Sequence, residues 1–167
     1  PRSVLPLQWH DRTADSVRPS GLRGDMKAIN AIRMGGVDVL PLVEGGKGVA
    51  ISNGITAGHW AAGGGAGTLS AVNSDSYDAE GNPMPQVYHA KTRRDRHEEL
   101  VAYGIAGGIE QARRAHDIAG TRGRIHMNIL WEMGGAERVA TGILEQAKGL
   151  IHGITCGAGM PYRLSEI

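Results

Sequence analysis

A short loop that joins glycines to one lysine, EGGKG at residues 44–48, is the first place where the sequence could do chemistry. Glycine beside lysine is typical of phosphate cradles, but the nucleotide P-loop pattern GxxxxGK[ST] needs glycine where Pro41 stands and serine or threonine where Gly48 stands. Two readings remain. The glycines let the backbone approach a flat ring such as a flavin, or they only turn the chain.

Two other glycine-rich stretches fail the dinucleotide fingerprint GxGxxG. Both GGGAGT at residues 63–68 and CGAGMPY at residues 156–162 lack the last glycine. Neither stands in the order strand, turn, helix that the fingerprint requires. The sequence therefore disfavours a Rossmann dinucleotide site.

Among single polar residues, Asn128 is the best candidate for binding. Its amide offers both a donor and an acceptor at the end of an expected strand, which suits the imide-like edge of a flavin or a purine; alternatively, it satisfies nearby loop backbone. The strand residues His126 and His152 are more often structural than catalytic. Cys156 stands where a nucleophile could be, but no base can be assigned to it. The histidines have no metal-ligand spacing, so we expect no metal site.

Composition excludes several classes of partner. The 167 residues carry 18 basic and 17 acidic side chains, a net charge of +1, which gives no reason to expect nucleic acid or a membrane surface as partner. No apolar run is long enough to span a membrane. The single cysteine excludes an internal disulfide framework, and we expect a cytoplasmic protein that binds a small molecule.

The elements that position these residues follow an alternating pattern. Residues 1–38 read as an irregular N-terminal arm with one short helix over 25–34, and residues 39–167 read as βα units. A polar loop over 74–91 is long enough to be a lid or a subunit contact. The expected strands are 38–43, 67–73, 124–132 and 150–159 with its loop, and the expected helices are 56–64 capped by Thr56, 92–120 ended by Gly120, 136–148, and one starting at Pro161.

Strands that each precede a helix predict an α/β fold with a parallel sheet. Ligands of such sheets bind at the carboxyl ends of the strands. The unusual polar and glycine residues stand at those ends: Glu44 to Lys47, Asn73, Asn128, Trp131 with Glu132, and Thr155 to Gly157.

Three stretches resemble, in order and spacing, the N-terminal half of the nitronate monooxygenase family, also called the 2-nitropropane dioxygenase family. They are residues 40–73, 125–132 (IHMNILWE) and 149–161 (GLIHGITCGAGMP). Members are FMN-dependent TIM barrels. The resemblance covers about residues 39–167 and implies that four βα units form about half of a (β/α)8 barrel, a fold of about 250 residues.

The resemblance also implies site residues. The backbone of the 44–48 loop would meet the flavin, the 63–68 turn would precede the second strand, and Asn128 would contact the ring. The glycine and proline after the fourth strand fall on Gly159 and Pro161. EGGKG stands where many members have a more apolar, Met-containing segment, a departure that concerns the substrate more than the flavin.

We therefore expect an FMN-dependent oxidoreductase, similar to nitronate monooxygenase, that oxidises a small carbanionic substrate with oxygen. The expected cofactor-binding residues are Gly45, Gly46, Lys47, Gly48 and Asn128. Lys47 would stabilise the reduced ring if it points at the ring's pyrimidine edge, and is otherwise a surface charge. Catalytic and phosphate-binding residues are not assigned, because the resemblance puts them beyond residue 167.

A half-barrel leaves strand edges and one sheet face uncovered, so we expect a second chain or a further segment to complete it, with a homo-oligomer as another arrangement. Two alternatives stay open. One is a flavin-dependent enoyl thioester reductase of the same fold, and the other is a non-catalytic subunit or scaffold with a vestigial barrel.

Overall fold

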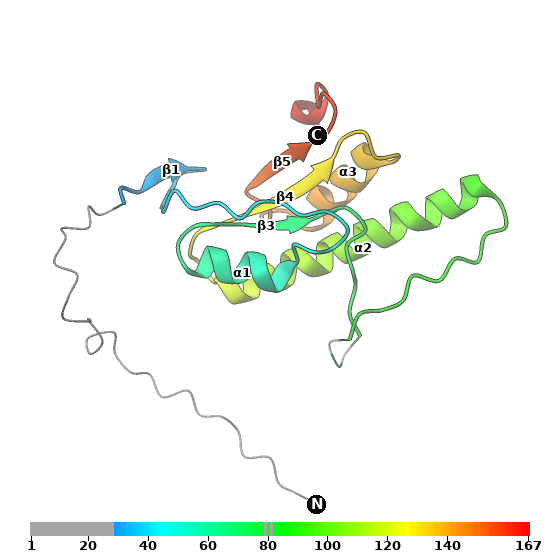
Figure 1. Cartoon of the computed structure of the whole chain (residues 1–167), viewed down its shortest axis with the longest axis horizontal. Helices are drawn as coiled ribbons and strands as arrows, with labels where there is room; N and C mark the ends of the chain where they lie inside the picture. Colours follow the sequence, from blue (N-terminus) through cyan, green and yellow to red (C-terminus); the bar gives the residue numbers. More distant parts are fainter. Residues whose placement is uncertain (1–28, 79, 81) are drawn as a thin grey trace, which may run out of the picture.

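The computed structural model describes residues 29–78, 80 and 82–167 of the chain (Figure 1). It contains five strands, three α-helices and one 3-10 helix in an α/β arrangement. The short helix expected over 25–34 lies partly outside these residues, as does most of the N-terminal arm. The elements are β1 (Ile32–Met34), β2 (Val37–Val39), α1 (Gly54–Ala62), β3 (Ala66–Ser70), α2 (Arg93–Ala119), β4 (Arg124–Leu130), α3 (Ala136–Gln146), β5 (Gly153–Gly157) and η1 (Leu164–Glu166).

The first two strands form an antiparallel hairpin, which corrects two expectations. Gly35 and Gly36 have φ angles of 55° and 82°, as the two-residue turns favoured in hairpins require. Residues 32–34 are therefore strand instead of helix. The strand expected over 38–43 is divided, because its start pairs with β1 while only Val43 bridges to the parallel sheet.

The larger sheet is parallel, and its strands lie in the order of the sequence. β3 pairs with β4 and β4 with β5, while Val43 makes a parallel bridge to Ala66 at the other edge of β3. The three predicted strands after the first are thus confirmed with shifted ends. A consecutive parallel order means that every crossover returns to the neighbouring position.

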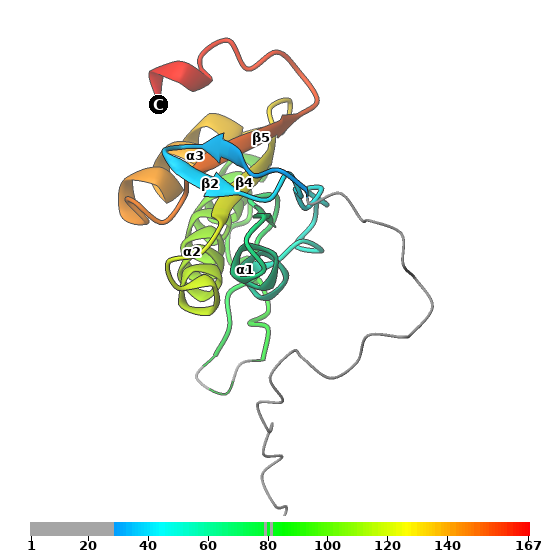
Figure 2. The same ribbon diagram turned by 90° about the vertical axis from the view of Figure 1, so that its left-hand side faces the viewer.

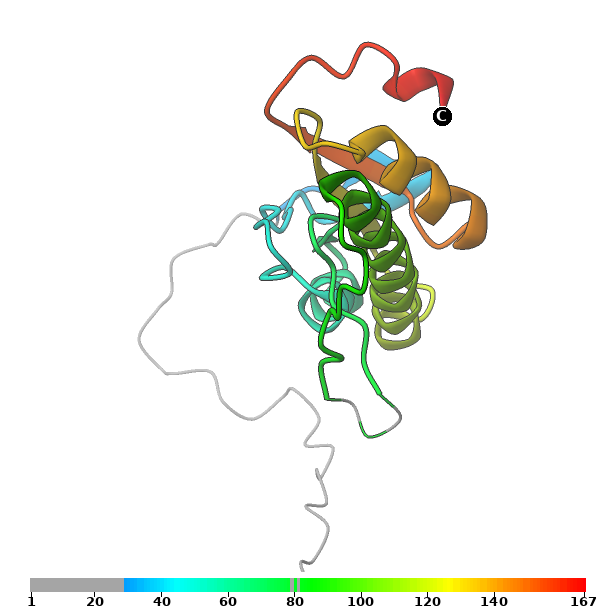
Figure 3. The same cartoon turned by 90° about the vertical axis from the view of Figure 1, so that its right-hand side faces the viewer.

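All three helices pack on one face of this sheet (Figures 2 and 3). α2 lies between α1 and α3 and contacts both. One core joins them to the sheet through small residues of the helices and through the large side chains of Leu69, Ile125, Met127 and Ile129. Gly108 lets Ile143 of α3 approach α2, since a Cβ there would collide with the Ile143 side chain.

Local signals set most helix ends. Thr92 caps α2 by accepting from the Asp95 N–H, and Gly120 follows its last residue with a φ of 59°, as expected. For α1 the expected cap was wrong: Asn53 is the N-cap, and Thr56 completes its capping box from the third helical position. After Pro161 the chain makes only the short η1.

Residues 82–91 of the long loop run beside the N-terminal part of α2 (Figure 1). Tyr103 of α2 donates from its hydroxyl to the Val87 carbonyl at 2.7 Å, and its ring meets that of Tyr88 edge-on. Glu99 accepts from the His89 N–H at 3.0 Å. The role of the 74–91 loop as a lid or a subunit contact stays a prediction. Among the helices that the structure describes, none is long and apolar enough to cross a membrane.

Candidate functional site

The candidate site lies where the parallel strands end. Four loops meet at the carboxyl edge of the sheet, following Val43, β3, β4 and β5. Backbone strain is concentrated in the same loops. Among the described residues other than glycine, every positive φ occurs there: Val49 at 53°, Ala50 at 60°, Asn73 at 49° and Ala158 at 48°. Left-handed backbone is unfavourable for such residues, and strain of this kind clusters at functional sites.

The first loop leaves the sheet at Glu44 and rejoins it at Ser52. Where the loop leaves the sheet, the Glu44 N–H donates to the Ala66 carbonyl at 2.8 Å, as in a regular parallel ladder. One step further, the Thr68 N–H is accepted by the Glu44 carboxylate at 3.1 Å instead of a main-chain carbonyl. The Ser70 N–H then donates to the Ser52 carbonyl at 2.8 Å. Residues 45–51 are therefore an excursion held to β3 on both sides.

Bonds inside the excursion close it on itself. The Lys47 N–H donates to the Ser52 hydroxyl at 2.9 Å, and the Ser52 N–H donates to the Lys47 carbonyl at 3.2 Å. The Ala50 N–H reaches the Val72 carbonyl in the loop after β3. The loop is thus ordered by contacts made within the chain.

Lys47 points back at its own loop. Its Nζ lies 3.6 Å from Glu44 Oε1 and donates to the Gly45 carbonyl at 3.3 Å, while 54% of its side chain is exposed. The Glu44 side chain is almost fully buried, with 4% exposed. The ammonium is therefore neither directed at another strand end nor left as an unpaired surface charge.

The glycines of this loop differ in what surrounds them. A Cβ on Gly46 would collide with Cβ and Cγ of Asn128 and lie 2.7 Å from its Oδ1, so glycine is required there. Gly45 and Gly48 face open space. The N–H groups of all three donate no hydrogen bond to a residue that the structure describes. The loop therefore offers three unpaired N–H groups, and Gly46 lies against Asn128.

Asn128 lies beneath this loop on the sheet face that the helices do not cover. It is registered between Ser70 of β3 and Thr155 of β5, and only 6% of it is exposed. Its amide makes no side-chain hydrogen bond within the described part of the chain. Unlike the fully buried polar atoms described next, its amide atoms keep some access to solvent. The structure thus brings two expected site residues, Gly46 and Asn128, into contact and leaves the amide free to bind.

One register step deeper, the same face holds two more polar atoms without partners. Thr68 Oγ1 and His126 Nε2 are buried and have no hydrogen-bond partner in the structure, and the two residues are paired in register. Burial lowers the pKa of His126, and the positive charge of Arg124 lowers it further. The imidazole is therefore held neutral. Thr68 was not predicted as a site residue, although the register of β3 with β4 places it beside His126.

Other candidates from the sequence have structural explanations. His152 Nδ1 accepts from the Ile125 N–H at 3.0 Å, which links β5 to β4. Cys156 is half-buried and packs against the helix-covered core. Gly159 has a φ of 84° and fits against Glu132, whereas Pro161 lies beyond β5, where its carbonyl accepts from the Leu164 N–H at 3.0 Å. Within the described ranges, no three acidic, histidine or cysteine side chains could share a metal ion.

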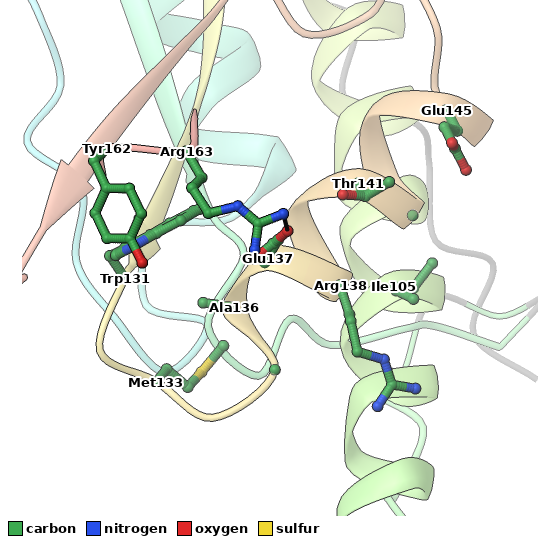
Figure 4. Close-up of a pocket in the computed structure, with 12 residues that line it drawn as sticks. Ile105, Trp131, Met133, Ala136, Glu137, Arg138, Thr141, Glu145, Tyr162 and Arg163 are labelled. Atoms are coloured by element: carbon green, nitrogen blue, oxygen red, sulfur yellow. Dashed lines mark ion pairs between the residues drawn. The ribbon is translucent and has the colours of Figure 1, made fainter. Parts of the chain in front are cut away.

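A groove of about 730 Å³ lies elsewhere, beside α3 (Figure 4). Trp131 and Tyr162 line one end, where Arg163 pairs with Glu137 at 3.1 Å. None of the five expected cofactor-binding residues lines it. It is an open surface groove, and the unpaired polar groups described above lie on the other side of the sheet.

Comparison with known proteins gives no assignment: no family model, no curated protein and no solved structure matches this chain.

Proposed function

We propose that this chain is the N-terminal part of an FMN-binding (β/α)8 barrel that acts as an oxidoreductase similar to nitronate monooxygenase. Support for the barrel comes from the winding of the sheet. Val43, β3, β4 and β5 are parallel and consecutive, and the helices pack on one face. Doubly wound folds reverse their strand order and cover both faces, whereas barrels do neither.

The uncovered face and edges also favour a barrel. Val43 and Leu130 are exposed large side chains. Among the described residues, no strand pairs with the free edge of β5, and beyond β3 the sheet continues only through the bridge at Val43. An exposed parallel edge invites pairing with more strands. In our proposal, further βα units from another segment or another chain close the barrel over the polar face.

One observation carries the flavin assignment: the unpaired amide of Asn128, which lies against Gly46 in a loop where Gly45, Gly46 and Gly48 have unpaired N–H groups. A flavin ring is flat and carries donors and acceptors along one edge, so it complements an amide together with bare backbone. Asn128 would hydrogen-bond that edge and Gly46 would let the loop approach it. A phosphate is a weaker match, because Lys47 is already engaged by Glu44.

FMN, when bound, would supply the electron transfer to and from the substrate. The chain's own residues would bind and orient the ring. A small substrate that loses a proton from carbon, such as a nitronate, would then be oxidised with oxygen as the acceptor. No described residue is assigned as the base.

FMN titration of the full chain, followed by quenching of flavin fluorescence, tests this proposal. Asn128→Ala removes the free amide, and Gly46→Ala pushes the loop off Asn128. We expect each to weaken FMN binding by about tenfold or more, because a lost hydrogen bond in a buried site is worth about 1.4 kcal/mol or more. Oxygen uptake with a nitronate, compared with oxidation of a reduced nicotinamide, then identifies the reaction.

Gly63→Ala is the matched control, since Gly63 lies at the opposite edge of the sheet and a Cβ there meets its nearest atom at 3.4 Å. It should bind FMN as the unaltered chain does. If the unaltered chain leaves flavin fluorescence unchanged, or if both site variants bind FMN normally, the proposed function is rejected.

A further inference from the structure

The Glu44 side chain serves two partners from a buried position in the wall of the candidate site. Oε2 accepts from the Thr68 N–H at 3.1 Å, where a continued strand would supply a main-chain carbonyl. Oε1 lies 3.6 Å from Lys47 Nζ. A carboxylate with 4% exposure and these two partners is held in one place, and its charge is balanced by one lysine.

Lys47 is correspondingly tethered. Its Nζ is drawn to Glu44 and donates to the Gly45 carbonyl at 3.3 Å. Gly46 lies between these groups in the sequence and touches Asn128. The balanced pair is therefore built into the same few residues whose backbone faces the candidate ring site.

We propose that Glu44 is a positioning residue that holds Lys47 against its own loop and cancels its charge, and thereby sets the reduction potential of the bound flavin. This inference rests on the proposed function. Two-electron reduction of a flavin with uptake of one proton leaves a negative charge on the ring. A net positive charge nearby favours the reduced form, and a net negative charge disfavours it. The intact pair presents neither.

A purely structural role for Glu44 predicts a different result, and one substitution separates the two. Glu44→Gln keeps an oxygen that accepts from the Thr68 N–H and removes only the charge. If Glu44 merely holds the loop to β3, this variant keeps the potential of the unaltered protein. If it balances Lys47, the potential changes.

The experiment measures the midpoint potential of FMN bound to the full chain, by slow enzymatic reduction beside a reference dye. Glu44→Gln leaves Lys47 uncompensated and should raise the potential. Lys47→Met leaves Glu44 uncompensated and should lower it, and the double variant should return close to the starting value. Each single shift corresponds to a change of up to about tenfold in the preference for reduced over oxidised FMN, as expected for one partly screened charge about 10 Å away.

Glu145→Gln and Lys148→Met are matched controls. Both side chains are exposed near the C-terminal end of α3 and have no ion pair with a described residue. Neither should move the potential. Unchanged potentials in both single variants, or shifts in the same direction, overturn the inference while FMN binding stands. Absence of FMN binding by the unaltered chain rejects the proposed function and this inference together. Should Glu44→Gln fail to fold, the direction of the potential shift in Lys47→Met, a substitution of a half-exposed side chain, decides the question alone.

Discussion

The two faces of the β3–β4–β5 sheet are built from alternate residues of the same strands, yet one face is apolar and packed by helices while the other carries polar groups without partners. On β4, Ile125, Met127 and Ile129 are fully buried beneath the helices. Between them, His126 and Asn128 point to the other face, where their polar atoms have no partners. Side chains alternate across a strand, so one face can hold the fold together while the other stays available for binding.

The face of the sheet that the helices do not cover is therefore where we expect function. Polar groups on the helix-covered face are few, whereas on the other face Thr68 Oγ1 and His126 Nε2 are buried without a partner. Such groups destabilise the fold unless something else binds them. Substitutions on the two faces should therefore change stability in opposite directions.

The largest effect is expected on the packed face. Met127→Ala should lower the free energy of unfolding by about 2–5 kcal/mol, because Met127 is fully buried in the core and the smaller side chain leaves a cavity. Denaturant unfolding followed by circular dichroism measures this. Thr155→Ala, at an exposed position on the opposite face of β5, is the control and should change stability by less than about 0.5 kcal/mol. Equal losses for both variants would contradict the comparison.

The next effect has the opposite sign. Asn128→Leu replaces an unpaired amide in a largely buried residue with an apolar side chain of similar size. The ligand-free protein should gain about 1–2 kcal/mol of stability from burial of the leucine side chain, while FMN binding is lost. Unfolding without FMN and titration with FMN measure the two quantities. A variant that is less stable without ligand would mean that the amide has a partner within the protein.

A smaller gain is expected at Thr68. Thr68→Val keeps the shape of the side chain and removes the hydroxyl that lacks a partner, so thermal unfolding should show a stabilisation of about 1 kcal/mol. Ser74→Ala is a useful contrast, because its buried hydroxyl donates to the Ser70 carbonyl and its loss should destabilise. If Thr68→Val destabilises as Ser74→Ala does, the hydroxyl is bound by a group such as an ordered water.

The smallest effect should be a pH dependence. The pKa of His126 lies below its ordinary value of 6.5 because burial disfavours the charged ring. The unfolded chain then binds the proton more readily than the folded one. The contribution of His126 to the free energy of unfolding is therefore fully present above pH 6.5 and is lost as the pH decreases towards the folded-state pKa. His126→Gln should make this fall shallower. His152, whose pKa is lowered mainly by burial too, accounts for a remaining slope of stability against pH. If a variant that lacks both His126 and His152 keeps the original slope, neither histidine causes the pH dependence.

Much of the fold could be predicted because its signals are local. The apolar stripe over 136–148 and the flanking Thr92 and Gly120 give α3 and α2 nearly to their ends. The strand over 38–43 was mispredicted, since its first residues pair with β1 through the turn at Gly35 and Gly36. A short apolar run does not by itself select a partner strand.

The candidate site, like the fold, was predicted only in part from the sequence. The sequence by itself placed a glycine loop after the first expected strand and Asn128 at the end of the third, because the residue types and the βα order are both written in the chain. Only tertiary structure decided that Gly46 rests on Asn128 and that Lys47 turns to Glu44, whose carboxylate replaces a strand carbonyl for Thr68. These contacts depend on the register between strands far apart in sequence, and register is set by packing the whole sheet against its helices.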